Sequence, residues 1–138
     1  MTAYTKLVLR EVAVSARVGL APWERERAQR LLVDVELHAD PEAYLASVST
    51  RSLIDYRLVY ERIQRWQGRA HTEILETLVS DLLDASFEDS QVVACRIWLR
   101  KVEALDRASA AGVDVFVTRR EYEYRPGGRS RPRVVPRS

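Results

Sequence analysis

The sequence is poor in the residues that build covalent cross-links and metal sites. It contains a single cysteine, Cys95, so no disulfide can form within the chain. With two histidines, His38 and His71, it offers only three soft ligands in total. With only three such ligands in the whole chain, we expect neither a structural nor a catalytic zinc site. We also expect no cofactor.

Long apolar runs are also absent. No segment approaches the roughly 18 consecutive apolar residues of a membrane span, and the N-terminus lacks the basic-then-apolar pattern of a signal peptide. The apolar fraction of 46% and the charged fraction of 30% are typical of ordinary globular chains. We therefore expect one cytoplasmic domain over residues 1–124, large enough to bury a hydrophobic core.

Acidic residues are missing from the C-terminal end. Residues 125–138 contain five arginines and no acid, which leaves 17 basic against 20 acidic residues in the remainder. The proline, glycine and arginine content of this segment predicts a disordered basic tail. Such a tail could contact RNA or an acidic surface. The body of the chain has no basic groove or nucleic-acid-binding motif, so we expect no nucleic-acid partner.

Hydrophobic periodicity predicts the order strand, strand, helix, helix, strand, strand. Alternation predicts strands over residues 5–18, 31–39, 93–101 and 112–122. Apolar spacing of three and four predicts one helix from Ser52 to Gly68, with Ser52 and Asp55 as its capping box, and another from Thr72 to Ala85. Residues 41–51 show no strong pattern. Two hairpins around a helix pair predict an α+β fold: one four-stranded antiparallel sheet with both helices on one face.

Two details of the predicted strands bear on packing. The parity of the apolar residues changes at Arg10-Glu11, which predicts a β-bulge in the first strand. In the third strand, alternation assigns Val93, Cys95, Ile97 and Leu99 to the helix-covered face. The opposite face of the sheet would then carry Leu32, Val92, Ala94 and Trp98. Such a surface, with open sheet edges, favours association of subunits, and we predict an oligomer.

One carboxylate stands at the edge of a buried helical stripe. Glu76 lies one turn before Val79 in a segment whose apolar residues are Ile74, Leu75, Leu78, Val79, Leu82 and Leu83. An ionised carboxylate at this position needs partners, because removing it from water is costly. A flat ligand with two adjacent N–H donors, such as a pterin, would supply a bidentate match. A simpler interpretation is that Glu76 only stabilises a helix N-terminus.

Three further side chains complete a possible acid–base set. Lys101 ends a strand with the parity of the helix-covered face, Glu24 lies in the charged loop 19–29, and Tyr56 lies near a helix start. Each has an ordinary alternative: a lysine that reaches water, a solvated acid and a packing tyrosine. Together they supply general acid–base chemistry without a metal or a nucleophilic cysteine.

Several segments, in order, resemble the motifs of the dihydroneopterin aldolase family. They are GLAPWERERAQ at 19–29, Asp55-Tyr56, ILETL at 74–78, Lys101 and Ala111-Gly112-Val113, and the resemblance spans residues 5–119. It implies the tunnelling fold, in which the sheets of four subunits close into a ring and two rings stack into an octamer. It also implies a pterin substrate and active sites that lie between subunits.

The resemblance further implies a role for each matching residue. Glu76 would anchor the pterin ring, and Tyr56 of a neighbouring subunit would cover the ring and donate a proton. Lys101 with Glu24 would handle protons around the side chain of the substrate, supported by Gln29. Further substrate contacts would come from Leu75, Ile54 and Asp55.

The chain also departs from the family pattern. Val102 follows the lysine where the family often has proline or a polar residue, and Leu53 stands where threonine is common. Asp114 replaces the second glycine of the usual Gly-Val-Gly, which adds a charge near the expected pocket.

Three functions therefore remain open from the sequence. The first is an aldolase that releases glycolaldehyde from 7,8-dihydroneopterin. The second is a 2′-epimerase, or a paralogue acting on a modified pterin, because the pattern of Lys101, Ala104 and Leu105 resembles dihydroneopterin triphosphate 2′-epimerases. The third is a pterin-binding oligomer without turnover.

Overall fold

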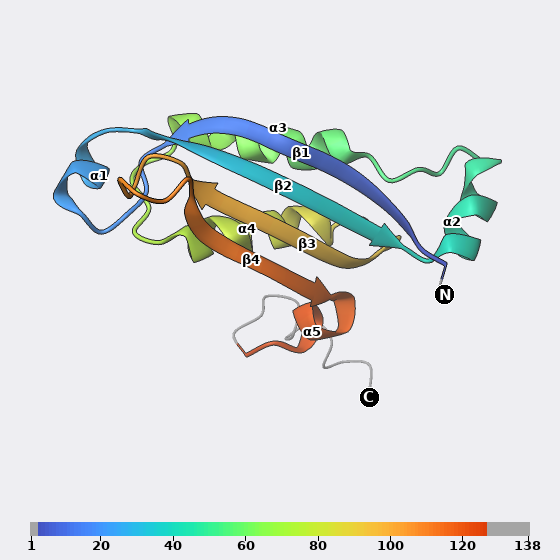
Figure 1. Ribbon diagram of the computed structural model, residues 1–138. Coiled ribbons are helices and arrows are strands. Elements are labelled where there is room, and N and C mark those ends of the chain that lie inside the picture. The colour runs from blue at the N-terminus through green and yellow to red at the C-terminus, as the bar shows by residue number, and fades with distance from the viewer. Residues whose placement is uncertain (1–2, 127–138) are drawn as a thin grey trace.

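Four antiparallel strands form one sheet in the order β1-β2-β3-β4 (Figure 1). The computed structural model describes residues 3–126, so most of the expected tail at 125–138 lies outside the described residues. The strands are β1 (Thr5–Ala16), β2 (Gln29–Ala39), β3 (Val92–Lys101) and β4 (Ala111–Thr118). The helices are α1 (Pro22–Glu26), α2 (Pro41–Val48), α3 (Tyr56–Gln64), α4 (Leu75–Ser86) and α5 (Arg119–Tyr124), with a 3-10 turn, η1, at Arg65–Gly68.

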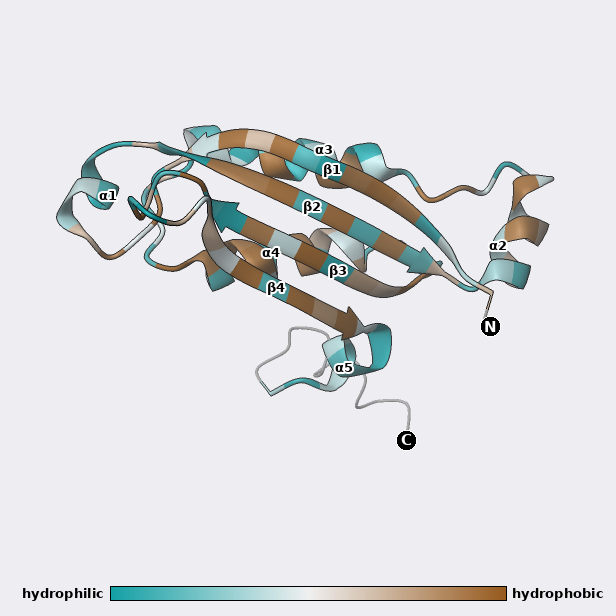
Figure 2. Cartoon of the chain, in the orientation of Figure 1, coloured by the Kyte–Doolittle hydropathy of each residue, from teal (hydrophilic) through white to brown (hydrophobic). Residues whose placement is uncertain are grey.

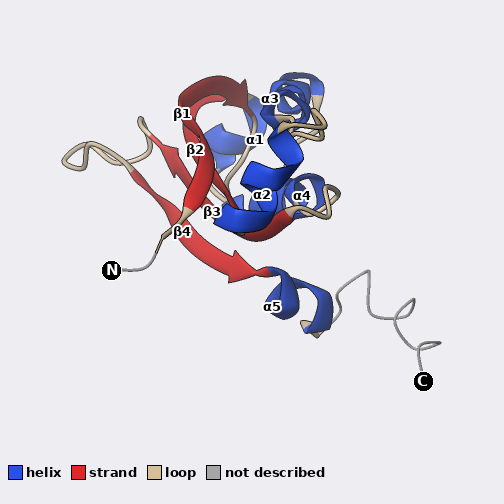
Figure 3. Ribbon diagram, turned by 90° about the vertical axis from the view of Figure 1, so that its right-hand side faces the viewer, coloured by secondary structure: helices blue, strands red, loops and turns tan. Residues whose placement is uncertain are grey.

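The helices α3 and α4 cover one face of the sheet, as predicted (Figure 3). Alternate strand residues point into this interface, which gives the banded hydropathy of the strands in Figure 2. The core joins apolar residues of both layers, among them Val33, Val35, Ile97, Leu99, Val59, Ile63, Leu78 and Leu82. Across residues 3–126, none of the helices has the length and apolar character that a membrane span requires. The predicted α+β fold is confirmed.

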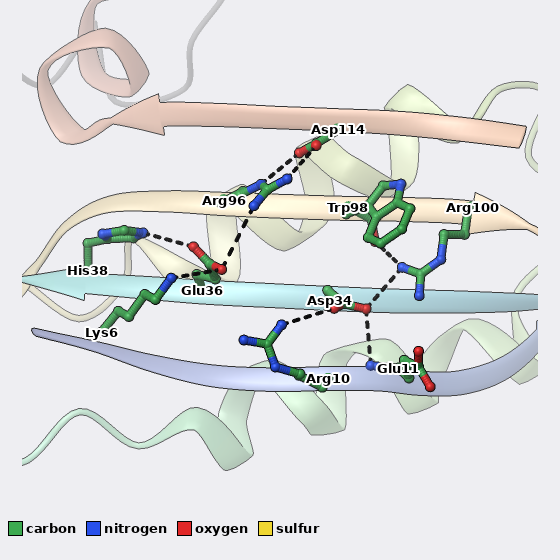
Figure 4. Close-up of polar contacts among 10 residues, drawn as sticks. All are labelled: Lys6, Arg10, Glu11, Asp34, Glu36, His38, Arg96, Trp98, Arg100 and Asp114. Carbon is green, nitrogen blue, oxygen red and sulfur yellow. Dashed lines mark hydrogen bonds and ion pairs between the residues drawn. The ribbon is translucent and has the colours of Figure 1, made fainter. Parts of the chain in front are cut away.

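The predicted bulge in β1 is also confirmed. Leu9 pairs with Val35 and Val12 with Val33, so Arg10 and Glu11 together lie opposite Asp34. Glu11 adopts a left-handed backbone conformation with φ of 53°. Its N–H donates to Oδ1 of Asp34 at 3.1 Å, which satisfies a backbone donor that the bulge removes from the ladder (Figure 4).

A second irregularity, at the start of β3, contradicts the prediction for Val92 and Val93. Ala39 pairs with Val92 while His38 pairs with Ala94, so one residue of β3 is skipped. As a result Val92 is fully buried in the core, whereas Val93 is 43% exposed. The prediction was wrong because alternation was extended unbroken to the end of the strand. Leu32, Ala94 and Trp98 do lie on the helix-free face, as predicted. They pair with Arg100, His38 and Asp34 respectively, and directly paired residues share a face of the sheet.

The helix-free face carries a lattice of ion pairs across the sheet (Figure 4). Asp34 accepts from Arg100 at 2.9 Å, and the Arg100 guanidinium lies 3.7 Å from the centroid of the Trp98 ring. Farther along, Glu36 contacts Lys6 at 3.1 Å, and Arg96 forms a two-point contact with Asp114. This surface is therefore more polar than the apolar patch that we expected.

The structure corrects several helix boundaries. Residues 41–51, which showed no pattern, contain α2, whose N-cap is Asp40. The helix predicted from Ser52 begins at Tyr56, because Asp55 and not Ser52 provides the N-cap by accepting from the N–H of Arg57. The helix predicted from Thr72 begins at Leu75.

The last predicted strand is shorter than expected. β4 ends at Thr118, whose side chain caps the short helix α5, whereas we had extended the strand to Tyr122. Arg119 ties α5 to the end of α4: it donates to the carbonyl oxygens of Val92, Phe87 and Asp89 at 3.0, 3.1 and 2.7 Å. Phe87 is the C-cap of α4, so Arg119 supplies a donor where the helix leaves carbonyl groups unpaired, and it also binds the loop that leads into β3.

We predict that Arg119→Ala destabilises the domain. Removal of one guanidinium leaves three carbonyl groups without this donor, and we expect the free energy of unfolding to fall by about 1–3 kcal/mol. The matched control is Arg120→Ala, because Arg120 is exposed and its guanidinium lies over the nearby Tyr124 ring, away from the end of α4. Urea denaturation of both variants checks the prediction, and equal losses would contradict it.

Candidate active site

A cleft of about 510 Å³ opens at the end of the sheet where α1 lies. Four segments meet there: the β1–β2 loop with α1, the start of α4, the end of β3 and the start of β4. Its walls combine apolar side chains with four charged ones, namely Glu24, Glu73, Glu76 and Lys101. The structure thus brings Glu24, Glu76 and Lys101 together in one cavity.

Glu24 and Lys101 are in direct contact although 77 residues separate them. Nζ of Lys101 donates to Oε2 of Glu24 at 2.8 Å. Nε2 of Gln29 donates to the same oxygen at 2.9 Å and to the carbonyl oxygen of Val18 at 2.8 Å. The other oxygen of Glu24 accepts from the backbone N–H of Ala21 at 3.1 Å. Gln29 is therefore a buried donor that holds the Glu24 carboxylate beside Lys101.

Glu24 is only 6% exposed, and its environment nevertheless favours the ionised carboxylate. Burial by itself raises the pKa of Glu24, but the hydrogen bonds from Lys101, Gln29 and the Ala21 backbone, with the charge of Lys101, outweigh it. The net effect lowers the pKa of Glu24 below its ordinary value. At neutral pH the cleft therefore holds a carboxylate paired with the lysine amine.

Two glycines permit this close arrangement. Gly19 has φ of 136°, a conformation that other residues rarely adopt, and a Cβ there would lie 2.1 Å from Cδ of Glu24. A Cβ on Gly112 would lie 2.0 Å from the carbonyl oxygen of Leu99 and 2.6 Å from Cα of Arg100. Side chains at these positions would displace Glu24 or push β4 away from the end of β3.

Glu76 lies in the first turn of α4 and lines the cleft. Its neighbour Leu75 is buried and forms part of the core, while the side chain of Glu76 is exposed. The helix start presents backbone N–H groups and favours negative charge. This end of the cleft can therefore hold a planar group through one carboxylate and adjacent N–H donors.

Tyr56, Asp55 and Ile54 do not join the cleft of their own protomer. They lie at the start of α3, near α2, whereas the cleft lies beside α1 at the other end of the molecule (Figure 1). Tyr56 is 46% exposed, Asp55 caps α3, and Ile54 is buried in the core. Within one chain, therefore, the tyrosine cannot act on a ligand held by Glu76.

The family departures fall in different places. Asp114 points to the helix-free face, where Arg96 lowers the pKa of its carboxyl group through hydrogen bonds and charge. It therefore adds no charge to the cleft. Ala104 and Leu105, which resemble the epimerase pattern, do line the cleft.

One residue near the site was not singled out from the sequence. Nε2 of His71 lies 2.7 Å from the carbonyl oxygen of Gly19, beside Glu24. We had counted His71 only as a possible soft ligand. Its position in the sequence, four residues before α4, could have drawn attention to it, because this segment lies beside the end of β1. Among residues 3–126, no group of three or more His, Cys, Asp or Glu side chains is arranged to hold a metal ion.

Several solved structures share this fold. The FolB protein of Vibrio cholerae O1 biovar El Tor superposes with a TM-score of 0.72 at 22% identity, covering 86% of this chain and all of that one. A dihydroneopterin aldolase from Burkholderia thailendensis bound to guanine gives 0.69 at 24% identity, covering 84% and 92%. E. coli dihydroneopterin aldolase in complex with neopterin gives 0.70 at 20%, covering 81% and 97%. These likenesses establish the fold.

Sequence comparison supplies the family. No curated protein sequence matches the chain. The family model described as FolB, dihydroneopterin aldolase, matches residues 7–118, which include every segment that lines the cleft and both ends of the helix layer. The chain therefore belongs to the dihydroneopterin aldolase (FolB) family.

Proposed function

We propose that this chain is a metal-independent aldolase that cleaves 7,8-dihydroneopterin into 6-hydroxymethyl-7,8-dihydropterin and glycolaldehyde. The observation that carries the proposal is the contact of Lys101 with Glu24 at 2.8 Å in the same cleft as Glu76. The acid–base pair and the exposed carboxylate of Glu76, at the start of α4, line the same cleft. The exposed carboxylate would bind the planar ring of the substrate, and the acid–base pair would act on the reactive side chain of that ring.

Glu76 binds the pterin ring in this proposal. A pterin presents a ring N–H and a 2-amino group side by side, and a carboxylate accepts both in a charge-assisted pair. The relative bound to guanine is relevant because guanine carries the same two donors. Leu75 and the start of α4 provide the backbone beside the ring.

The reaction needs only proton transfers and a well-placed charge. A base takes the proton of the 2′-hydroxyl group, the C1′–C2′ bond breaks, and glycolaldehyde leaves. The electron pair of the broken bond moves through C6 into the N5=C6 imine of the ring. A proton is then added at C1′, which gives the hydroxymethyl product and restores the imine.

The cleft residues divide this work. Glu24, ionised at neutral pH, and Lys101 form one proton-carrying pair at the end of β3, where the side chain of the substrate would lie. The amine of Lys101 also stabilises the negative charge that develops toward N5. Gln29 holds the Glu24 carboxylate in place by donating a hydrogen bond to its Oε2.

Tyr56 takes part only if a second subunit brings it to the cleft. It is exposed at the opposite end of the protomer, together with Leu53 and Leu58, and these apolar side chains suit burial against a neighbour. We propose a homo-oligomer, a ring of four subunits or two stacked rings, in which Tyr56 of one subunit covers the pterin of the next. Ile54 and Asp55 would reach the substrate through the same interface.

A 2′-epimerase is the second candidate, because Ala104 and Leu105 of the epimerase-like pattern line the cleft. If the released glycolaldehyde presents its opposite face in the cleft and its carbonyl carbon re-forms the bond to C1′, the configuration at C2′ is inverted and no fragment leaves. Analysis of the products by chromatography separates the two: free glycolaldehyde indicates an aldolase, and an inverted side chain alone indicates an epimerase. Pterin binding without either product would contradict both.

We predict that loss of either member of the acid–base pair removes turnover and spares ring binding. Glu24→Gln and Lys101→Met should each lower kcat by about 10²- to 10⁴-fold, the usual range for a general acid or base. The dissociation constant for guanine should stay within a few-fold of the unmodified protein, because Glu76 is unchanged. Steady-state kinetics measures kcat and calorimetry measures guanine binding. An unchanged kcat would refute the assignment of Glu24 and Lys101 as the acid–base pair.

We predict that Glu76→Ala abolishes measurable binding of guanine and of the pterin. The carboxylate is the only acceptor proposed for the paired N–H donors of the ring. Glu73→Ala is the matched control, because Glu73 lines the same cleft, is also exposed to solvent and lies outside α4. Titration calorimetry distinguishes them; a loss of binding in both variants would point to net charge and not to Glu76.

We predict that mixed oligomers of two inactive variants recover activity. If Tyr56 acts on a neighbour's cleft, mixing Tyr56→Phe subunits with Lys101→Met subunits creates some clefts with both groups intact. Mixing Glu24→Gln with Lys101→Met subunits creates none, because both residues belong to the same cleft. Activity after co-refolding tests this, and recovery in neither mixture would exclude a shared site.

A further inference from the structure

The backbone of Gly19 is held from both sides by the segment before α4. Its N–H donates to the carbonyl oxygen of Thr72 at 3.0 Å, and its own carbonyl oxygen lies 2.7 Å from Nε2 of His71. Val18 and Thr72 also form an isolated parallel bridge. This places His71 at the point where β1 gives way to the loop that carries Glu24.

The orientation of Gly19 determines where the Glu24 carboxylate can lie. Its Cα packs so closely on this carboxylate that a Cβ would fall 2.1 Å from Cδ and 2.1 Å from Oε1 of Glu24. Two residues later, the N–H of Ala21 donates to Oε1 of Glu24. A rotation of the peptide after Gly19 would therefore change both the packing surface and a donor of the carboxylate.

We propose that His71 is a positioning residue for Glu24 that acts through the carbonyl group of Gly19. This inference rests on the proposed function, because it assigns His71 a part in the same reaction. His71 does not touch the proposed reacting atoms. It fixes the peptide against which the catalytic carboxylate is aligned with Lys101.

The chemistry of the contact defines the state of His71. A carbonyl oxygen can only accept, so Nε2 must carry a proton. Nε2 is protonated both in one neutral tautomer and in the imidazolium ion, and the hydrogen bond survives in either state. His71 therefore holds Gly19 through the same Nε2 donor in both states.

Another contact joins the same two segments, but it is solvated. Nη2 of Arg25 in α1 lies 3.6 Å from Oε2 of Glu73, and the two side chains are 50% and 66% exposed. Exposed ion pairs of this kind contribute little to stability. Arg25→Ala is therefore a matched control: it removes a tether between the same segments without disturbing Gly19.

The test compares variants that keep or lose the Nε2 donor. His71→Gln can place an amide N–H near the position of Nε2, whereas His71→Phe and the shorter His71→Asn cannot. We expect kcat to fall about 10- to 100-fold in His71→Phe and His71→Asn, the scale of a small misplacement of a catalytic group. His71→Gln and Arg25→Ala should keep most of the activity, and all four should bind guanine normally.

A second readout is independent of turnover. The ¹³C resonance of the Glu24 carboxyl group, assigned by comparison with Glu24→Gln, reports its pKa directly. Loss of alignment weakens the hydrogen bonds that lower this pKa, so it should rise toward the ordinary glutamate value in His71→Phe and His71→Asn and remain low in His71→Gln. The other charged groups of the cleft, Lys101, Glu73 and Glu76, are the same in every variant.

The outcomes separate the two proposals. An unchanged kcat and an unchanged Glu24 pKa in His71→Asn would overturn the role of His71, even if His71→Phe failed to fold. Equal losses in His71→Gln and His71→Asn would overturn it too, because the donor would then be irrelevant. Absence of turnover in the unmodified protein would refute the proposed function alone, since the Glu24 titration would still test the positioning contact.

Discussion

The contact between Glu24 and Lys101 organises this end of the molecule. A buried carboxylate needs hydrogen-bond donors, and Glu24 has three: an amine at the end of β3, an amide at the start of β2 and a backbone N–H of its own loop. Those three donors come from three segments. The carboxylate to which we assign the proton transfer is thus also the group around which the β1–β2 loop folds.

Most of the fold could be predicted because a strand with one buried face shows alternating apolar and polar residues in the sequence. The parity change at Arg10-Glu11 correctly predicted the bulge, since side chains repeat every two residues. The second irregularity buries Val92 in place of Val93. Both residues are valine, so the apolar pattern does not change and the sequence does not indicate which of them is buried. The helices α1 and α5, of five and six residues, were missed because they are too short to show a helical period. Helix α2 has eight residues but buries none of them, so no apolar stripe marks it.

The candidate site was predicted less completely. Residue type and spacing, with the family resemblance, identified Glu24, Lys101 and Glu76, and the fold brings them together. His71 was not predicted because its ring contacts a backbone carbonyl oxygen, and contacts with the backbone have no sequence pattern. Tyr56 presents the opposite case: it is recognisable by its place in a motif, but its proposed partner belongs to a different chain.

The bulge in β1 has a consequence for the free edge of the sheet. β1 is an outer strand, and the left-handed residue Glu11 turns its N–H inward to Asp34 in the middle of that edge. An approaching strand thus meets two short ladders out of phase with each other instead of one continuous ladder. Only a strand with a matching kink, or one confined to half the edge, can add to it, which protects the exposed edge from indiscriminate fibril-like growth.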